Sequence, residues 1–158
     1  MSLAIVPGSF DPMTMGHFDL IRRVAKDYDQ VVVAVMINDQ KQYLFDLSTR
    51  LEIAQASVEE LSNVRVIADE GMLIDLFDRL GADAVCKGWR NETDYAYETK
   101  MAEWNLAHNP KCVTRLYPSA GDHASVSSTQ VREYLQKGEI PEDLLHPHAY
   151  SVIKMKKL

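Results

Sequence analysis

Cysteine is scarce in this sequence of 158 residues, and its scarcity excludes one way of holding a small protein together. Only Cys86 and Cys112 are present, each within an apolar run, and they form no C-x-x-C pair. The chain is therefore not a disulfide-rich secreted scaffold. We predict two buried, reduced thiols, and a hydrophobic core large enough to stabilise the fold without covalent or metal cross-links.

Long apolar runs and an excess of basic residues are also missing. No apolar stretch approaches the ~20 residues of a membrane-spanning helix, and the N-terminus lacks the features of a signal peptide. We therefore expect a soluble cytoplasmic protein that binds no membrane. The 17 basic and 23 acidic residues give a net charge of −6, which argues against a nucleic acid partner. A local basic pocket for a small phosphorylated ligand is compatible with this charge.

Short β-branched runs alternate with helical patterns along the chain. Residues 31–37 are continuously apolar, as in a strand buried on both faces of a parallel sheet. The alternation predicts an α/β protein with a doubly wound, parallel five-stranded sheet. We expect strands at residues 3–6, 31–37, 64–68, 84–86 and 112–117, and helices at 16–26, 47–61, 72–80 and 95–107. Because no linker interrupts the pattern, we expect one domain over residues 1–158, with a last helical segment from about residue 141.

Ligands of such sheets bind at the carboxyl ends of the strands, so the segments that follow the strands are the candidate binding sites. The first is P-G-S-F-D-P-M-T-M-G-H, residues 7–17. Gly8 allows close approach of a ligand, Ser9 offers a hydroxyl, and His17 opens a helix whose first amides favour anions. The alternative interpretation is a structural turn with a capping histidine.

A second segment, V-S-S-T-Q-V-R, follows the last expected strand at residues 126–132. It places three hydroxyl groups at a helix start and Arg132 one turn later. Together with free backbone amides, these groups would form a cradle for a polyphosphate. Ordinary helix capping is the alternative.

Cations follow two other strands. Lys87 and Arg90 come after residues 84–86, and Lys41 comes after the valine-rich run. Arg90 can bind a phosphate through two parallel hydrogen bonds, although a solvated charged loop would also explain these residues. No G-x-S-x-G or H-E-x-x-H pattern is present. Nucleophilic catalysis by the protein is therefore not indicated.

Together these segments resemble the nucleotidylyltransferase superfamily, whose T/H-x-G-H and I-S-S-T-x-x-R motifs correspond to residues 14–17 and 126–132. Residues 7–17 and 88–98 are similar to two patterns of the bacterial phosphopantetheine adenylyltransferase family, P-G-[ST]-F-D-P-x-T-x-G-H and R-G-[LW]-R-x-x-x-D-[FY]-x-Y-E. Two departures stand out. Lys87 replaces the usual arginine, and residues 123–125 lack the common aromatic residue.

The resemblance implies a Rossmann-like nucleotidyltransferase fold and a specific reaction. The adenylyl group of ATP would pass to 4'-phosphopantetheine, giving dephospho-coenzyme A and pyrophosphate. Transfer between two phosphates needs alignment and charge neutralisation but no covalent enzyme intermediate. Mg²⁺ is expected with ATP, and a homohexamer is implied by the family. Feedback by coenzyme A is an option that the sequence does not decide.

The resemblance also implies roles for residues at the matched positions. His17, Lys41 and Arg90 would be catalytic, and no protein ligand to a metal is expected. Phosphopantetheine would be contacted by Ser9, Lys41, Leu73 and Lys87. ATP would be contacted by a larger set: Ser9, Phe10, His17, Gly88, Trp89, Arg90, Glu98, His123, Ala124, Ser125, Val126, Ser127, Ser128, Thr129 and Arg132.

Two alternatives stay open. One is another enzyme of the superfamily, which would transfer a nucleotidyl group to nicotinamide mononucleotide or glycerol 3-phosphate. Residues 7–17 and 126–132 fit such an enzyme equally well. Residues 88–98 argue against it, because they match the pattern of the phosphopantetheine adenylyltransferase family. The second is a catalytically silent nucleotide-binding regulator. The presence of His17, Lys41 and Arg90 argues against that interpretation.

Overall fold

The computed structural model describes residues 1–157, leaving aside the side chain of Lys157. The last residue of the predicted domain, Leu158, lies outside the described residues. Five strands form one sheet in which every neighbouring pair is parallel, in the order β3-β2-β1-β4-β5. The predicted doubly wound α/β fold is confirmed. The strands are β1 (Leu3–Gly8), β2 (Gln30–Met36), β3 (Val64–Asp69), β4 (Ala84–Trp89) and β5 (Thr114–Pro118).

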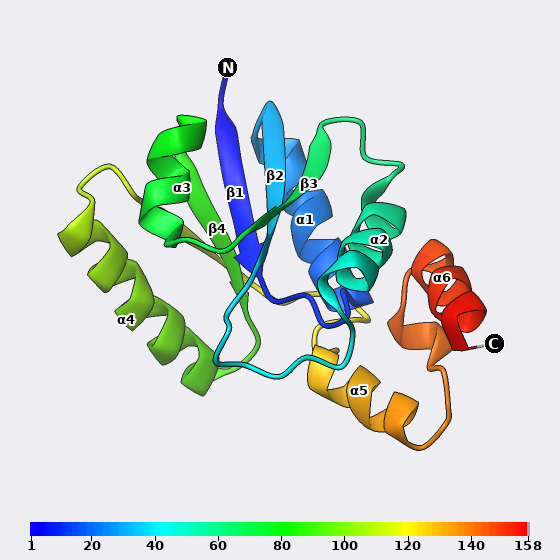
Figure 1. The fold of residues 1–158 in the computed structure, drawn as a ribbon. Helices are drawn as coiled ribbons and strands as arrows, with labels where there is room; N and C mark the ends of the chain where they lie inside the picture. Colours follow the sequence, from blue (N-terminus) through cyan, green and yellow to red (C-terminus); the bar gives the residue numbers. More distant parts are fainter. Residues whose placement is uncertain (158) are drawn as a thin grey trace.

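Helices cover both faces of the sheet (Figure 1). On one face lie α1 (Met15–Asp27), α2 (Leu47–Val58) and the C-terminal α6 (Pro147–Lys157). The opposite face is covered by α3 (Leu73–Leu80) and α4 (Glu92–His108). The chain between β5 and α6 forms α5 (Ser128–Gln136) and a short 3₁₀ helix, η1 (Glu142–Leu144). Within residues 1–157, each helix is too short or too polar to cross a membrane.

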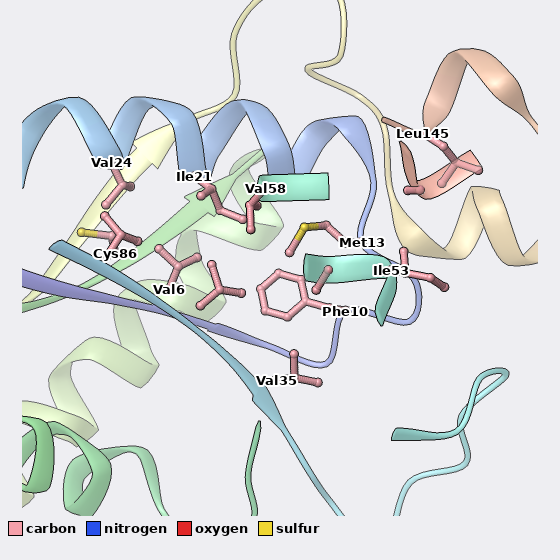
Figure 2. Close-up of a cluster of buried hydrophobic side chains, with 14 of the residues drawn as sticks. Val6, Phe10, Met13, Ile21, Val24, Val35, Ile53, Val58, Cys86 and Leu145 are labelled. Carbon is pink, nitrogen blue, oxygen red and sulfur yellow. The ribbon is translucent and has the colours of Figure 1, made fainter. Parts of the chain in front are cut away.

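The two cores follow from the alternation of side chains along the strands. In β2, Val31, Val33 and Val35 pack towards α1 and α2, whereas Val32 and Ala34 pack towards α3. Figure 2 shows the first of these clusters, in which Phe10 and Met13 of the loop after β1 lie among strand and helix residues. The middle of the candidate binding segment, residues 7–17, is therefore anchored in the core.

Several expected boundaries are wrong, each for a local reason. Strand β4 continues to Trp89 because it pairs with β5 along its whole end, so Lys87 lies within the strand rather than in a loop. Helix α4 begins at Glu92 because Asn91 caps it, accepting a hydrogen bond from the Asp94 amide. Cys112 is buried and free, as is Cys86, but it lies in a turn before β5.

The position of the site follows from the strand order. The chain adds β2 and β3 on one side of β1, and then crosses back to add β4 on the other side. Such a reversal leaves a crevice beyond the carboxyl ends of the two central strands. The segments that follow β1 and β4 meet there, at the lower edge of the sheet in Figure 1, where α5 also begins.

Candidate active site

A cleft of about 430 Å³ lies at this edge, between the segments that follow β1, β4 and β5. Basic, hydroxyl and imidazole side chains from distant parts of the sequence line it together. Most residues predicted from the sequence are among them: Ser9, Phe10, His17, Lys41, Lys87, Gly88, Arg90, Glu98, His123, Ala124, Val126, Ser127, Ser128, Thr129 and Arg132.

Three predicted residues do not line the cleft. Leu73, at the start of α3, lines a second pocket. The Trp89 ring packs edge-on against Tyr95, with 5.0 Å between the ring centroids. Ser125 is exposed on the loop before α5.

His17 is held in a defined tautomer in the first turn of α1. Its Nδ1 accepts a hydrogen bond from the backbone N–H of Thr14 at 3.0 Å, so the proton of the neutral ring is on Nε2. This arrangement is half of a capping box, in which Thr14 is the N-cap residue. The capping interpretation and the functional one therefore both apply, since capping uses Nδ1 and leaves Nε2 as a donor.

The environment of His17 keeps the ring neutral. Partial burial, followed by the positive charges of Lys87 and Arg90, lowers the pKa of His17 from 6.5 to about 4. The Phe10 and His17 rings form a T-shaped contact, with centroids 5.0 Å apart. A neutral, oriented Nε2–H donor facing a basic cleft is suited to a phosphate oxygen whose charge grows during reaction.

Ser9 and Lys41 meet although 32 positions separate them. The Lys41 ammonium donates a hydrogen bond to Ser9 Oγ at 3.0 Å. The loop that carries Lys41 is fixed by Asp11, whose carboxylate accepts hydrogen bonds from the amides of Leu44 and Phe45 at 2.7 and 2.9 Å. The segments after β1 and β2 therefore form one structural unit.

Two carboxylates of α4 hold the cations of the β4 end. Lys87 Nζ lies 3.1 Å from Glu98 Oε2, and Arg90 Nε lies 3.0 Å from Asp94 Oδ2. Because Asp94 engages Arg90 at Nε, the two terminal nitrogens of the guanidinium stay available within the described part of the chain. Arg90 can therefore present a forked pair of donors to a phosphate.

The start of α5 is joined to the segment after β1. Arg132 donates to the backbone oxygen of Asp11 at 2.9 Å, and Ser128 Oγ donates to that of Pro12 at 2.7 Å. Ser127 is an ordinary N-cap, so the capping alternative applies to it. Beyond these contacts, the first amides of α5 have no partner inside the helix and can receive an anion.

The sequence did not predict two residues, Asp11 and Arg50, that hold the backbone of the segments lining the cleft. Asp11 lies inside a segment that we singled out, but its role as an acceptor for a distant loop has no sequence signal. Arg50, in the first turn of α2, is 2% exposed and donates to the backbone oxygen of Ser9 at 3.0 Å. A helical pattern places an arginine on the surface, so only the tertiary structure reveals this contact.

The carboxylates of the cleft are already engaged. Asp11 binds backbone amides, and Asp94 and Glu98 pair with cations. Across residues 1–157, no three histidine, cysteine, aspartate or glutamate side chains gather as metal ligands do. Mg²⁺ prefers oxygen ligands of the kind that phosphate groups provide.

A second pocket of about 330 Å³ adjoins the cleft on the α4 side of the sheet. Lys87 and Glu98 line both spaces. The rest of the lining is largely apolar, with one buried hydroxyl, that of Thr114, which has no hydrogen-bond partner among the described residues. The other lining residues are Met72, Leu73, Val85, Met101, Trp104 and Asn105.

Comparison with solved structures supports the fold. A protein from Vibrio parahaemolyticus, provisionally assigned as a nicotinate-nucleotide adenylyltransferase, superposes with a TM-score of 0.76. The match covers 99% of this chain and 94% of that one. The two sequences are only 18% identical, so the likeness concerns the architecture alone.

Comparison of sequences gives the family. Residues 5–134 match the cytidylyltransferase-like family. The phosphopantetheine adenylyltransferase of Limosilactobacillus reuteri (strain DSM 20016) is 40% identical over 138 residues, which cover 87% of this chain and 80% of the relative. That of Heliobacterium modesticaldum (strain ATCC 51547 / Ice1) is 38% identical over 147 residues, covering 93% and 88%. This chain thus belongs to the cytidylyltransferase-like superfamily and, within it, to the phosphopantetheine adenylyltransferase family.

Proposed function

We propose that this protein transfers the adenylyl group of ATP to 4'-phosphopantetheine, forming dephospho-coenzyme A and pyrophosphate in coenzyme A biosynthesis. The observation that carries the proposal is that the cleft and the second pocket lie next to each other. The cleft, lined by Lys41, Arg90 and Arg132 among others, contains a neutral histidine donor. A largely apolar pocket opens beside it and shares Lys87 and Glu98 with the cleft. The names of the two relatives agree with this reading.

The chemical step is a direct displacement at the α-phosphorus of ATP. A phosphate oxygen of the acceptor forms the new P–O bond, while the bond to the β-phosphate oxygen breaks and pyrophosphate leaves. His17 Nε2–H would donate to an α-phosphate oxygen, and Lys41 and Arg90 would hold the attacking and transferring phosphates. Alignment and neutralisation of charge are sufficient for such a step, so no protein nucleophile takes part.

Pyrophosphate would be held by the start of α5. The free first amides of this helix and the guanidinium of Arg132 support contacts to the β- and γ-phosphates, together with Ser127, Ser128 and Thr129. Mg²⁺ would enter bound to ATP and supply charge neutralisation at the phosphates.

The acceptor arm would lie in the second pocket. A pantetheine arm combines methylene and methyl groups with two amides, which suits an apolar pocket containing few polar groups. The unpartnered hydroxyl of Thr114 and the half-buried Lys87 support this placement, with Leu73 at the apolar wall. Lys87 would then serve the phosphate end of the acceptor while Glu98 holds its ammonium.

Assembly, location and feedback belong to the same proposal. Self-association into a homohexamer is supported by exposed apolar side chains along α4, among which Tyr95 is 46% exposed and Leu106 47%. Two free, buried thiols are compatible with the reducing cytoplasm. Coenzyme A contains both the adenosine and the pantetheine arm of the product, so it would fit both spaces and compete with the substrates.

The test is the effect of His17→Ala on pyrophosphate release from ATP and 4'-phosphopantetheine. Removal of one donor that acts in the transition state lowers kcat about a hundredfold or more, with little change in either KM. His148→Ala, at a half-exposed position on α6, is the matched control and keeps wild-type kcat. An unchanged kcat in His17→Ala would reduce His17 to a helix cap.

A further inference from the structure

The loop between β2 and α2 carries Lys41 but has little packing of its own. Asn38, Gln40 and Lys41 are exposed. They form a tight turn, in which Asn38 Oδ1 accepts from the Gln40 amide and the Asn38 backbone oxygen accepts from the Lys41 amide, each at 3.0 Å. Contacts at the two ends of the loop hold this turn in place. At the far end, the amides of Leu44 and Phe45 bind the Asp11 carboxylate. At the near end, the Asn38 amide donates to the hydroxyl of Tyr43 at 3.0 Å.

Tyr43 connects this loop to a buried charge. Its ring lies 3.8 Å from the Arg50 guanidinium carbon, measured to the ring centroid. Arg50 is 2% exposed, and its Nε has no hydrogen-bond partner among the described residues. The face of the ring is therefore a principal partner for a desolvated cation. The Lys41 ammonium lies 5.8 Å from the centroid of the same ring.

Arg50, Tyr43 and Lys41 form a connected set of contacts that includes Ser9. Arg50 donates to the backbone oxygen of Ser9 at 3.0 Å, and Lys41 donates to its hydroxyl at 3.0 Å. Tyr43 joins the two cations through its ring, and joins the two sides of the loop through its hydroxyl. Tyr43 and Arg50 do not themselves line the cleft.

We propose that Tyr43 is a positioning residue for Lys41, which acts by stacking on Arg50 and by bridging to the Asn38 amide so that the ammonium stays beside Ser9. This inference rests on the proposed function, in which Lys41 holds the phosphates that react. Without the ring, Arg50 would lose a partner and the loop tip would lose its near anchor. Lys41 would then sample positions away from the acceptor phosphate.

The test is a double-mutant cycle between Tyr43 and Lys41. Calorimetry would give the Kd of 4'-phosphopantetheine, and pyrophosphate release would give kcat and KM for both substrates. In the wild-type background, Tyr43→Ala lowers kcat/KM for the acceptor on the order of 10- to 100-fold, because small misplacements of a positioning group are costly. In a Lys41→Ala background, the same change has an effect of less than about twofold, because the two residues act as one unit.

Two further variants separate positioning from folding. Tyr43→Phe keeps the ring over Arg50 and loses only the hydroxyl. Its kcat/KM for the acceptor therefore lies between those of wild type and Tyr43→Ala. Leu44→Ala, an exposed neighbour whose backbone contact is retained, is the matched control and keeps wild-type kinetics. In Tyr43→Ala the KM for ATP changes less than the KM for 4'-phosphopantetheine, because ATP would keep its contacts at the start of α5.

Equal losses from Tyr43→Ala in both backgrounds, or no loss in either, would overturn the inference. A general folding defect gives equal losses, so the cycle distinguishes it from positioning. Failure of the wild-type protein to form dephospho-coenzyme A would overturn the proposed function, and this inference with it. An active wild-type protein with an additive cycle would overturn the inference alone.

Discussion

His17 shows how a single side chain acquires its chemistry from its neighbours. The Thr14 amide fixes its tautomer, and partial burial beside Lys87 and Arg90 lowers its pKa to about 4. A histidine with an ordinary pKa near 6.5 would be partly charged near neutrality. Held neutral, His17 provides the same hydrogen-bond donor over the whole range in which ATP binds as a polyanion.

The lowered pKa has a consequence for stability that can be measured. Between pH 6.5 and 4 the unfolded chain binds a proton at His17 that the folded chain does not. The free energy of unfolding therefore has its full value, as far as His17 is concerned, above pH 6.5, and it decreases as the pH falls to 4. The loss is up to about 3 kcal/mol for a shift of this size.

Denaturation of wild type and His17→Gln across this range checks the prediction. The difference in free energy of unfolding between the two proteins isolates His17, since the other titrating groups are common to both. Wild type loses stability relative to the variant on acidification, and NMR titration places the pKa of His17 near 4. A constant difference, with His17 titrating near 6.5, would contradict the described environment.

At the level of elements, the sequence predicted what depends on local pattern. The valine-rich run suits a strand with both faces buried, and β2 is such a strand. Boundaries that depend on partners were wrong. The end of β4 is set by pairing with β5, and a sequence window does not contain that partner. The start of α4 depends on Asn91, a residue type that is common at helix N-caps.

Gly16 joins two elements and gives a prediction at this scale. A Cβ placed on Gly16 would lie 2.8 Å from the backbone oxygen of Val126, closer than side chains tolerate. Gly16→Ala must therefore push the segment before α5 away from α1. We expect a loss of stability of about 1–3 kcal/mol and a higher KM for ATP, because the cradle at the start of α5 moves.

Gly71→Ala is the matched control for this variant. Its Cβ would lie 3.5 Å from Asp69 Oδ2, an ordinary contact, and the position is exposed. Thermal unfolding and ATP kinetics of the two variants give the comparison. Wild-type values for Gly16→Ala would show that α5 does not depend on close approach to α1.

At the level of the whole molecule, topology explains both the success and the limits of sequence reasoning. Polar residues at the ends of parallel strands could be expected to meet at one edge, and the cleft gathers Ser9, Lys41 and Arg90 there. No comparable rule predicts from the sequence which residues contact one another behind the cleft. Arg50 and Tyr43 became visible only when the fold placed α2 against the loop after β1.

The second pocket is the other feature that sequence alone did not provide. It forms where α3, α4, β4 and β5 come together, and its lining residues are scattered between positions 72 and 114. Leu73 was expected near the acceptor only through the family resemblance. Leu73 lines the apolar wall of this pocket beside Lys87, and its contact with the acceptor stays a prediction.

The choice of acceptor tests the central claim most directly. Purified protein with MgATP would be assayed for pyrophosphate release with 4'-phosphopantetheine and with nicotinamide mononucleotide, and the products would be identified by mass. We expect release and dephospho-coenzyme A with the first acceptor, and no release above background with the second. Activity with nicotinamide mononucleotide and none with 4'-phosphopantetheine would contradict the account, and would reassign the pocket beside Lys87 to another role.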